Sequence, residues 1–220
     1  IKFLTKYKNC VIFGSCVVKE IKKEIKKEFS KVFFVKSENL KDFIKIKYKD
    51  VKKLGTDRIL AAFAVKEIFG GNSLIILCGT ALVIDYINNK CEYLGGEIFP
   101  GIYNLLNTLH TSTSQLPFIN FKDIKIIKSN DLIGRTTFEC ISKGIINFVV
   151  SGIKNLIKIF NPRFIIITGG EADIVGKYLD KKNMYVMPEL VLLGLILFSF
   201  RKNFLTEDEF LNIIKNFITS

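Results

Sequence analysis

The stretch GGNSLIILCGTALVIDYINNKCEYLGGEI, which runs from Gly70 to Ile98, decides the fold. After an opening Gly-Gly-Asn-Ser turn it holds three apolar runs, at residues 74–77, 82–87 and 92–98. A glycine at position 79 and an Asn-Asn pair at 88–89 separate the runs, and both are typical turn signals. Strand, tight turn, strand, turn and strand in this order predict a β-meander.

Apolar periodicity on either side of this stretch predicts further elements. Before it we expect strands at 9–18, 32–35 and 44–48 and helices at 19–29 and 57–69. After it we expect a strand at 165–167 and helices at 103–109, 137–160, 172–179, 190–200 and 207–217. Each half combines strands with flanking helices, so we predict an α/β protein with a mixed sheet in each half. The boundary is expected near Gly70, between domains 1–70 and 71–220.

The composition is that of a globular protein with a sizeable core. Of the 220 residues, 49% are hydrophobic and 25% are charged, which excludes a disordered chain. The formal net charge of +12 suits a nucleic-acid or membrane-surface partner. The lysines are scattered, however, and no single basic block stands out, so a solvated lysine surface is the simpler interpretation.

The cysteines and the single histidine bear on metal binding and on the compartment. The five cysteines form no Cys-x-x-Cys pair and there is one histidine, so no Cys/His zinc site is expected, and we assign no residue as a metal ligand. Scattered thiols in odd number favour a reducing compartment. The first residues lack the apolar stretch of a signal peptide. Residues 190–200 are strongly apolar but fall short of the about 20 residues of a membrane span. We therefore expect a cytoplasmic protein with no membrane partner.

Gly55-Thr56-Asp57-Arg58 places a carboxylate and a guanidinium together where a helix is expected to begin. Backbone N–H groups and the dipole at a helix start favour a carboxylate, and such an aspartate can act as a general base towards a substrate hydroxyl. The arginine offers a planar fork suited to a carboxylate or a phosphate. An aspartate cap followed by a surface arginine explains the same residues, and four residues alone favour that reading.

Two glycine-marked turns are candidates for phosphate binding. Gly79 lets a phosphate approach the backbone, and the Thr80 hydroxyl is a further donor, although an ordinary hairpin glycine explains the turn equally simply. Thr168-Gly169-Gly170 ends a strand and opens a helix, where backbone N–H groups can meet a nucleotide, and a plain strand-to-helix turn is the alternative. No Walker A pattern occurs.

Taken together and in this order, the motifs resemble those of the type III pantothenate kinase family over residues from about 9 to about 195. The family's GxDR motif, with a tyrosine seven residues upstream, is matched by residues 55–58 and Tyr48. The remaining matches are Ser15-Cys16-Val17 for Ser-Ser-Val, residues 79–81 for DxGTA, 95–101 for GGxIxPG, 113–117 for T-x-Q-L-P, Thr137, Ile141 and Gly144 for TxxxIxxG, 168–172 for TGGxA and 188–195 for P-[DE]-L-x-L-x-G-L.

The resemblance implies two ribonuclease H-like domains of the acetate kinase, sugar kinase, Hsp70 and actin superfamily. It implies ATP-dependent phosphorylation of pantothenate to 4′-phosphopantothenate, the first step of coenzyme A biosynthesis, with Mg²⁺ and in a homodimer. Asp57 is then the catalytic base. The residues implied to hold pantothenate are Tyr48, Gly55, Thr56, Asp57, Arg58 and, across the dimer, Thr137. Those implied to contact ATP are Gly79, Thr80, Gly169 and Gly170.

Two departures from the family pattern stand out. The family opens with an Asp-x-Gly-Asn-Thr phosphate loop, whereas this sequence begins Ile1-Lys2-Phe3, so its N-terminal domain is expected to lack the first strand and that loop. The aspartate of DxGTA, which binds a monovalent cation in the family, aligns with Leu77. An apolar side chain cannot replace an oxygen ligand, which puts K⁺ or NH₄⁺ dependence and ATP affinity in question. The alternative is a catalytically impaired member that acts as a Baf-type transcriptional regulator.

Overall fold

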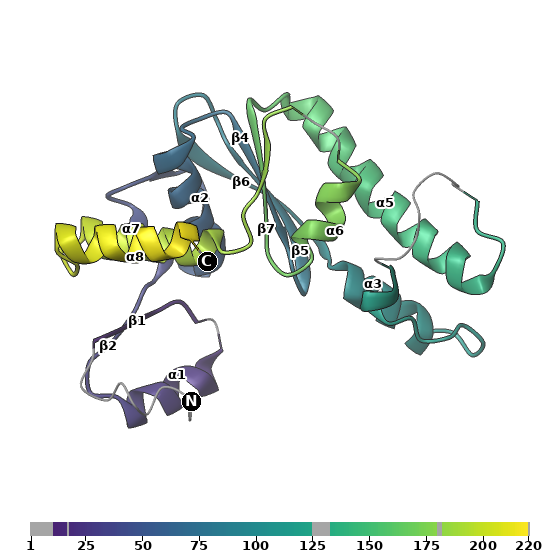
Figure 1. The fold of residues 1–220 in the computed structure, drawn as a ribbon, viewed down its shortest axis with the longest axis horizontal. Coiled ribbons are helices and arrows are strands. Elements are labelled where there is room, and N and C mark those ends of the chain that lie inside the picture. Colours follow the sequence, from purple (N-terminus) through teal and green to yellow (C-terminus); the bar gives the residue numbers. More distant parts are fainter. Residues whose placement is uncertain (1–10, 17, 125–132, 180–181, 220) are drawn as a thin grey trace. The chain divides into compact units, whose positions relative to one another are not determined.

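The computed structural model describes residues 11–16, 18–124, 133–179 and 182–219 (Figure 1). Contacts divide the chain into two compact units, which we call unit 1 and unit 2. Unit 1 consists of Ile1–Ile68 and Leu190–Ser220, and unit 2 of Phe69–Glu189. The predicted Asn9 and Cys10 of the first strand and Val17 of the Ser-Cys-Val motif lie outside the described residues.

Unit 2 is built on the predicted meander. Strands β4 (Ser73–Cys78), β5 (Ala81–Ile87) and β6 (Glu92–Pro100) pair antiparallel in sequence order. Strands β7 (Phe164–Thr168) and β8 (Met184–Val186) extend the sheet in parallel on the other side of β4. The order β6-β5-β4-β7-β8 therefore makes a mixed sheet, and both the meander and the α/β class are confirmed.

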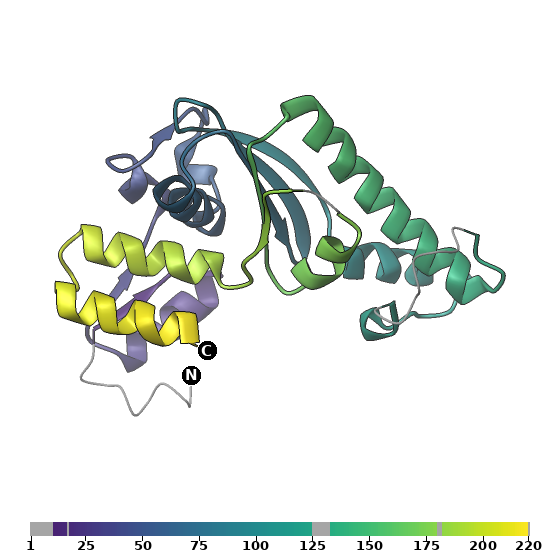
Figure 2. The same ribbon diagram turned by 45° about the horizontal axis from the view of Figure 1, so that its top comes forward.

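Helices cover one face of this sheet. They are α3 (Ile102–Thr111), α5 (Thr137–Phe160) and α6 (Ala172–Lys177), and Figure 2 shows them on the same side of the strands. Alternate residues of β4 and β5, among them Ile76 and Ile84, point to that side and form one apolar core with the helices. A short helix, α4 (Phe121–Ile124), follows α3. The sheet and the three helices thus bury a continuous apolar layer.

Helix α5 is the one helix of the described residues that is long and apolar enough to cross a membrane. It has 24 residues, with a mean hydropathy of 1.3 in its most apolar window. Its apolar residues recur at helical spacing, and eight of them, including Ile145 and Ile153, are buried against the sheet and neighbouring helices. A core helix of a globular unit passes the same test of length and composition, so this helix is weak evidence for a membrane span.

Unit 1 contains a small parallel sheet and a group of helices. Strands β1 (Ile12–Gly14) and β2 (Val32–Phe34) pair in parallel and are joined through helix α1 (Lys19–Glu28). Two 3-10 turns, η2 (Ser37–Leu40) and η3 (Val51–Lys53), flank the two-residue strand β3 (Lys45–Ile46), which is shorter than the strand predicted at 44–48. Helices α2 (Thr56–Ile68), α7 (Leu190–Arg201) and α8 (Glu207–Thr219) complete the unit.

Phenylalanine rings form much of the core of unit 1. Phe198 of α7 lies edge-on to Phe43, with ring centroids 5.9 Å apart, and stacks at 6.5 Å with Phe33 of β2. Phe204 lies 4.5 Å from Phe13 of β1. These contacts tie α7 and the following turn to the first strands of the chain. The predicted domains, 1–70 and 71–220, stay a prediction, and the division into units counts α7 and α8 with the first of them.

Helices α2 and α7 cross closely at Gly194. A Cβ atom at this position would overlap the backbone carbonyl of Leu60 in α2. Leu60 is fully buried, and Arg201 at the end of α7 pairs with Glu67 at the end of α2. A glycine inside a helix is normally unfavourable, so its presence here is explained by the close approach of the two backbones.

We predict that Gly194→Ala destabilises the protein by about 1–3 kcal/mol, because the added methyl group forces the two helices apart. The measurement is the urea concentration at the midpoint of unfolding. Leu192→Ala is the control on the same helix, since 45% of the Leu192 side chain is exposed and less packing is lost. A midpoint for Gly194→Ala at or above that of the control would contradict the close crossing.

Candidate functional site

The Gly-Thr-Asp-Arg segment forms the beginning of α2. Thr56 is the first helical residue, and Asp57 lies in the first turn with its carboxylate exposed to solvent. A Cβ atom at Gly55 would lie 2.6 Å from Oδ1 of Asp57, so the carboxylate folds back towards the Gly55 backbone. The first turn of a helix favours negative charge. The structure therefore holds an ionisable, solvent-accessible carboxylate at a defined place.

Arg58, which follows Asp57 in the first turn of α2, lies beside the Tyr48 ring. The Arg58 guanidinium carbon is 5.7 Å from the centroid of the Tyr48 ring, within range of a cation–π interaction. Arg58 is buried, with 6% of its surface exposed, and Tyr48 is half-buried. The planar guanidinium of an arginine suits a carboxylate or phosphate. Five of the predicted substrate-side residues, from Tyr48 to Arg58, are thus brought together within unit 1.

Ser37 supports this segment and was not singled out from the sequence. Its hydroxyl donates to the carbonyl of Leu54 at 2.6 Å and lies 3.5 Å from the Thr56 hydroxyl. Ser37 and Thr56 are both buried. The loop that leads into α2 is therefore fixed by a side chain that comes from a different turn of the chain, which a local sequence pattern does not reveal.

In unit 2, Gly79 and Thr80 form the turn between β4 and β5. The carbonyl of Thr80 accepts the backbone N–H of Gly101 at 3.0 Å and the side-chain amide of Asn104 at 2.8 Å. A Cβ atom at Gly101 would overlap the carbonyl of Gly79. The Thr80 side chain remains exposed. The turn is thus held from one side by the start of α3 and presents a hydroxyl to solvent.

The turn at Gly169 and Gly170 follows β7 and lies beside the turn at Gly79. Strands β4 and β7 are parallel, with Leu77 opposite Thr168, so their carboxyl ends meet at one edge of the sheet. Gly169 has a φ of +95°, and a Cβ atom there would overlap the carbonyl of Cys78. Ligands of α/β sheets bind outside the carboxyl ends of the strands. The four predicted ATP-side residues, Gly79, Thr80, Gly169 and Gly170, are therefore grouped at a suitable edge.

Glu171 belongs to this edge and was missed in the sequence. It is 8% exposed, and its two carboxylate oxygens accept the backbone N–H groups of Ile102 and Tyr103. Burial raises the pKa of the Glu171 carboxyl, and the two backbone hydrogen bonds oppose that rise. Burial, with a smaller contribution from the Glu171 charge, raises the pKa of the Cys78 thiol to about 12. The one sequence feature that could have pointed to Glu171 is its place, directly after a Gly-Gly pair at a helix start.

Thr137 begins α5 and is exposed. The preceding Thr136 caps the helix by accepting the backbone N–H of Glu139 at 3.2 Å, and the Glu139 carboxylate accepts the N–H of Arg135 at 2.8 Å. These two hydrogen bonds fix the start of the helix that carries Thr137. Its implied contact with pantothenate across a dimer involves a second copy of the chain and stays a prediction.

The described residues offer few side chains that could bind a metal ion. The described part of the chain holds no group of three or more His, Cys, Asp or Glu side chains that could bind a metal ion. Leu77, at the position of the family's cation aspartate, is a buried apolar residue in β4. The sheet edge instead offers backbone N–H groups and the Thr80 hydroxyl, which suit the phosphates of a nucleotide rather than a bare cation.

Comparisons with known proteins agree on one family. A family model described as type III pantothenate kinase matches residues 2–159. Two proteins named type III pantothenate kinase, from Persephonella marina and Flavobacterium johnsoniae, are 35% identical over 190 residues and 34% identical over 186 residues. The alignments cover 82% of this chain and 71% of the first protein, and 81% and 74% for the second.

A solved structure, described as a Baf family transcriptional activator from Campylobacter jejuni, superposes with a TM-score of 0.65. The superposition covers 93% of this chain and 89% of that structure at 24% sequence identity. At this level of identity the likeness concerns the fold alone, and it supports the predicted α/β architecture.

We predict that the two neighbouring glycines of the β7 turn differ in their tolerance of substitution by alanine. Gly169→Ala should destabilise the protein by about 1–3 kcal/mol, because alanine is strained at positive φ and its methyl group overlaps the Cys78 carbonyl. Gly170→Ala, whose Cβ meets no atom within 4 Å, should change the unfolding free energy by about 0.5 kcal/mol or less. Urea unfolding of both variants is the measurement. Equal losses of unfolding free energy in the two variants would show that the close approach to Cys78 does not constrain the turn.

Proposed function

The chain belongs to the type III pantothenate kinase family, and we propose that it transfers the γ-phosphoryl group of ATP to the hydroxyl of pantothenate. The product is 4′-phosphopantothenate, and the reaction opens coenzyme A biosynthesis. The four free cysteines among the described residues suit the reducing cytoplasm, where we place the protein. The observation that carries the proposal is the Asp57 carboxylate, held exposed at the start of α2 beside the buried Arg58.

In the proposed reaction, Asp57 accepts the proton of the pantothenate hydroxyl as that oxygen attacks the γ-phosphorus. One P–O bond forms to the substrate oxygen, and the bond to the bridging oxygen of ADP breaks. Arg58, fixed by its burial and by the Tyr48 ring, binds the carboxylate of pantothenate. Phosphoryl transfer depends mainly on positioning and charge neutralisation, so these fixed groups suit the reaction.

The ATP side of the proposed site is the edge formed by the β4 and β7 turns. The Thr80 hydroxyl and the backbone N–H groups of Gly169 and Gly170 are the donors for the phosphates, while the Gly79 N–H donates to the Ala81 carbonyl at 3.1 Å. Mg²⁺, when bound with ATP, neutralises the charge on the transferred group. Because Leu77 offers no oxygen ligand, we propose that the activity does not depend on K⁺ or NH₄⁺ at this position.

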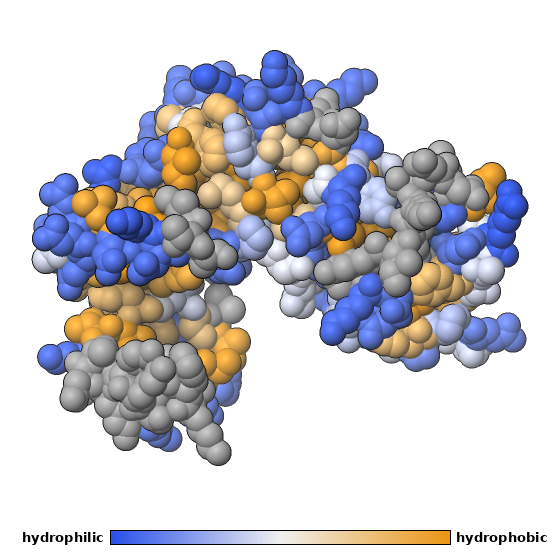
Figure 3. Space-filling view, in the orientation of Figure 1, coloured by the Kyte–Doolittle hydropathy of each residue, from blue (hydrophilic) through white to orange (hydrophobic). Residues whose placement is uncertain are grey.

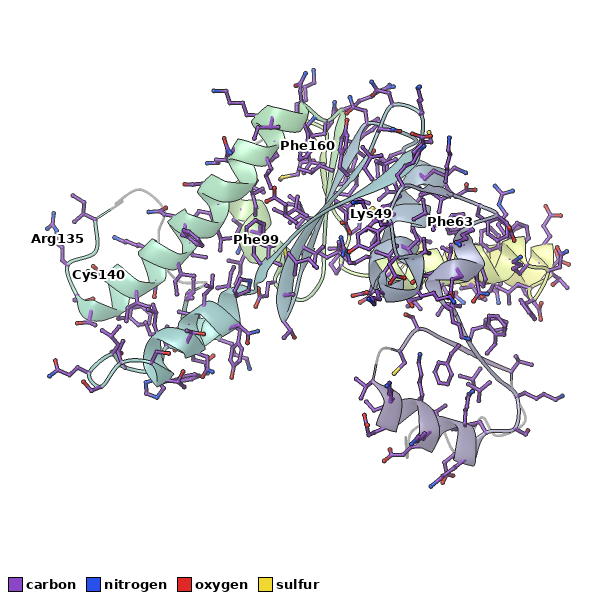
Figure 4. The ribbon with its side chains drawn as sticks, turned by 180° about the vertical axis from the view of Figure 1, so that it is seen from behind. Lys49, Phe63, Phe99, Arg135, Cys140 and Phe160 are labelled. Carbon is purple, nitrogen blue, oxygen red and sulfur yellow. The ribbon has the colours of Figure 1, made fainter. Side chains whose placement is uncertain are left out.

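We propose that the protein is a homodimer in which a second copy covers an apolar groove between α3 and α5. Two hollows, of about 560 and 450 Å³, lie along these helices and share Leu105 and Phe148. The Phe148 side chain is 69% exposed, which is unusual for so large an apolar group. Figure 3 shows apolar side chains reaching the surface around α3 and α5, and Figure 4 labels Cys140 and Phe160 near the two ends of α5. In a two-fold dimer the same surface of both copies forms the interface, so exposed apolar side chains such as Phe148 of each copy would cover the groove of the other.

The regulator alternative is not favoured. The relatives that match over most of the chain are named as kinases, and the Baf-family structure supports the fold alone. The net charge of +12 comes from lysines that are spread along the sequence rather than gathered on one recognition helix. A kinase with a solvated lysine surface accounts for the same charge.

We predict that Asp57→Asn lowers kcat for pantothenate phosphorylation by about 100-fold or more, because the amide cannot accept the hydroxyl proton. The assay uses purified protein with Mg-ATP, with and without K⁺ or NH₄⁺. Asp50→Asn is the matched control, since Asp50 is an exposed aspartate of the same unit whose partner is Lys53 at 3.4 Å. Turnover that survives in Asp57→Asn would remove Asp57 as the base, and wild-type turnover that requires K⁺ would contradict the interpretation of Leu77.

We predict that Phe148→Asp converts the dimer to a monomer, because an ionised carboxylate in an apolar interface loses its hydration. Light scattering coupled to size-exclusion chromatography gives the molar mass. Ile159→Asp is the control, since Ile159 is 64% exposed on the same helix but does not line the groove. A wild-type monomer, or equal dissociation by both variants, would contradict the proposed interface.

A further inference from the structure

Glu171 is a buried carboxylate to which the proposed reaction assigns no chemical step. Its Oε2 accepts the backbone N–H of Ile102 at 3.2 Å, and its Oε1 accepts that of Tyr103 at 3.3 Å. Its own backbone N–H donates to the carbonyl of Cys78 at 3.2 Å. One residue therefore connects the β7 turn, the end of β4 and the start of α3.

The carboxylate does for α3 what a capping side chain normally does. The first N–H groups of a helix have no partner inside the helix, and the residue before α3 is Gly101, which has no side chain to offer. Glu171 supplies two acceptors to the first two helical residues from a segment far away in the sequence. Negative charge at this end of a helix is also favoured by the helix dipole.

The start of α3 in turn holds the turn that carries Thr80. Gly101 donates its N–H to the Thr80 carbonyl at 3.0 Å, and Asn104 donates its side-chain amide to the same oxygen at 2.8 Å. Both donors belong to the segment whose first turn Glu171 binds. The Cys78 carbonyl, directly before Gly79, accepts from the Glu171 backbone. Glu171 thus acts on both sides of the Gly79-Thr80 turn.

The burial of this carboxylate works against its own ionisation. Burial raises the pKa of Glu171 despite two opposing hydrogen bonds, and the group also raises the pKa of Cys78. An apolar residue of similar length would avoid the desolvation of a charge but would leave the N–H groups of Ile102 and Tyr103 without this acceptor. A glutamate at position 171 is explained if the positions of α3 and Thr80 matter for function.

We propose that Glu171 is a positioning residue that fixes the Gly79-Thr80 turn in the conformation that binds the phosphates of ATP. The proposal rests on the function proposed above, because it names a residue that acts through Thr80 on the same reaction. It assigns Glu171 no contact with ATP, pantothenate or the transferred phosphoryl group.

The test compares Glu171→Gln with wild type in two independent measurements on the full chain. Hydrogen exchange followed by mass spectrometry should show amides of residues 79–82 and 101–105 exchanging about tenfold faster, as expected when charge-assisted hydrogen bonds are weakened, with residues 145–157 of α5 unchanged. Steady-state kinetics should show the KM for ATP raised about five- to tenfold, with the KM for pantothenate within about twofold of wild type.

Glu209→Gln is the matched control, because the Glu209 carboxylate also accepts a backbone N–H at a helix start, that of Thr206 at 2.8 Å, but does so in unit 1. It should change neither the exchange of residues 79–82 nor the KM for ATP. If Glu171→Gln fails to fold, Asn104→Ala removes one of the two donors to the Thr80 carbonyl and should raise the KM for ATP in the same selective way.

The two measurements separate the two proposals. Unchanged exchange at residues 79–82 in Glu171→Gln, or equal rises in both KM values, would overturn the positioning role. A wild-type protein without turnover would instead overturn the proposed function, and the exchange data would still decide whether Glu171 holds the Thr80 turn.

Discussion

The parallel pairing of β4 with β7 is the constraint on which the rest of unit 2 depends. It sets Leu77 opposite Thr168 and so brings the turns that follow the two strands to one edge of the sheet. The approach is close enough that Gly169, at a φ of +95°, is the one residue type that fits against the Cys78 carbonyl without strain. The same closeness lets the Glu171 backbone reach β4 while its carboxylate reaches α3. The two turns proposed to bind the nucleotide therefore take their geometry from a strand pairing rather than from their own sequences.

Features that depend on neighbouring residues were predictable from the sequence. The meander was predicted because each turn signal stands directly between the runs that it joins, and β4, β5 and β6 follow those runs closely. A helix was predicted to begin at Asp57, one residue after its observed start at Thr56, because the Gly-Thr-Asp sequence immediately precedes an apolar helical pattern. The order of the short motifs also sufficed to predict the family, since glycines and charged residues at turns are what a family pattern records.

Features that depend on contacts between distant residues could not be predicted from the sequence. Helix α7 is apolar nearly all round, so its pattern does not say which partner it packs against, and only Gly194, which fits against the Leu60 backbone, hints at a close helix crossing. The strand predicted at 44–48 shrinks to Lys45–Ile46, because alternation of apolar and basic residues alone does not ensure pairing along its whole length. Glu171 reads locally as an acidic residue at the start of α6, whereas its carboxylate partners, Ile102 and Tyr103, come from α3.

The two sets of candidate site residues differ in the same way. The substrate-side set, Tyr48 and residues 55–58, comes from one short stretch, and its geometry follows from one helix start and one ring contact. The ATP-side set comes from two turns, and the start of a third segment, α3, fixes one of them. A local set can be kept by conserving a short motif, but a set assembled across a sheet needs residues that touch no ligand to hold it together. Glu171 and Gly101 are such residues, and a motif defined by ligand contacts alone does not include their roles.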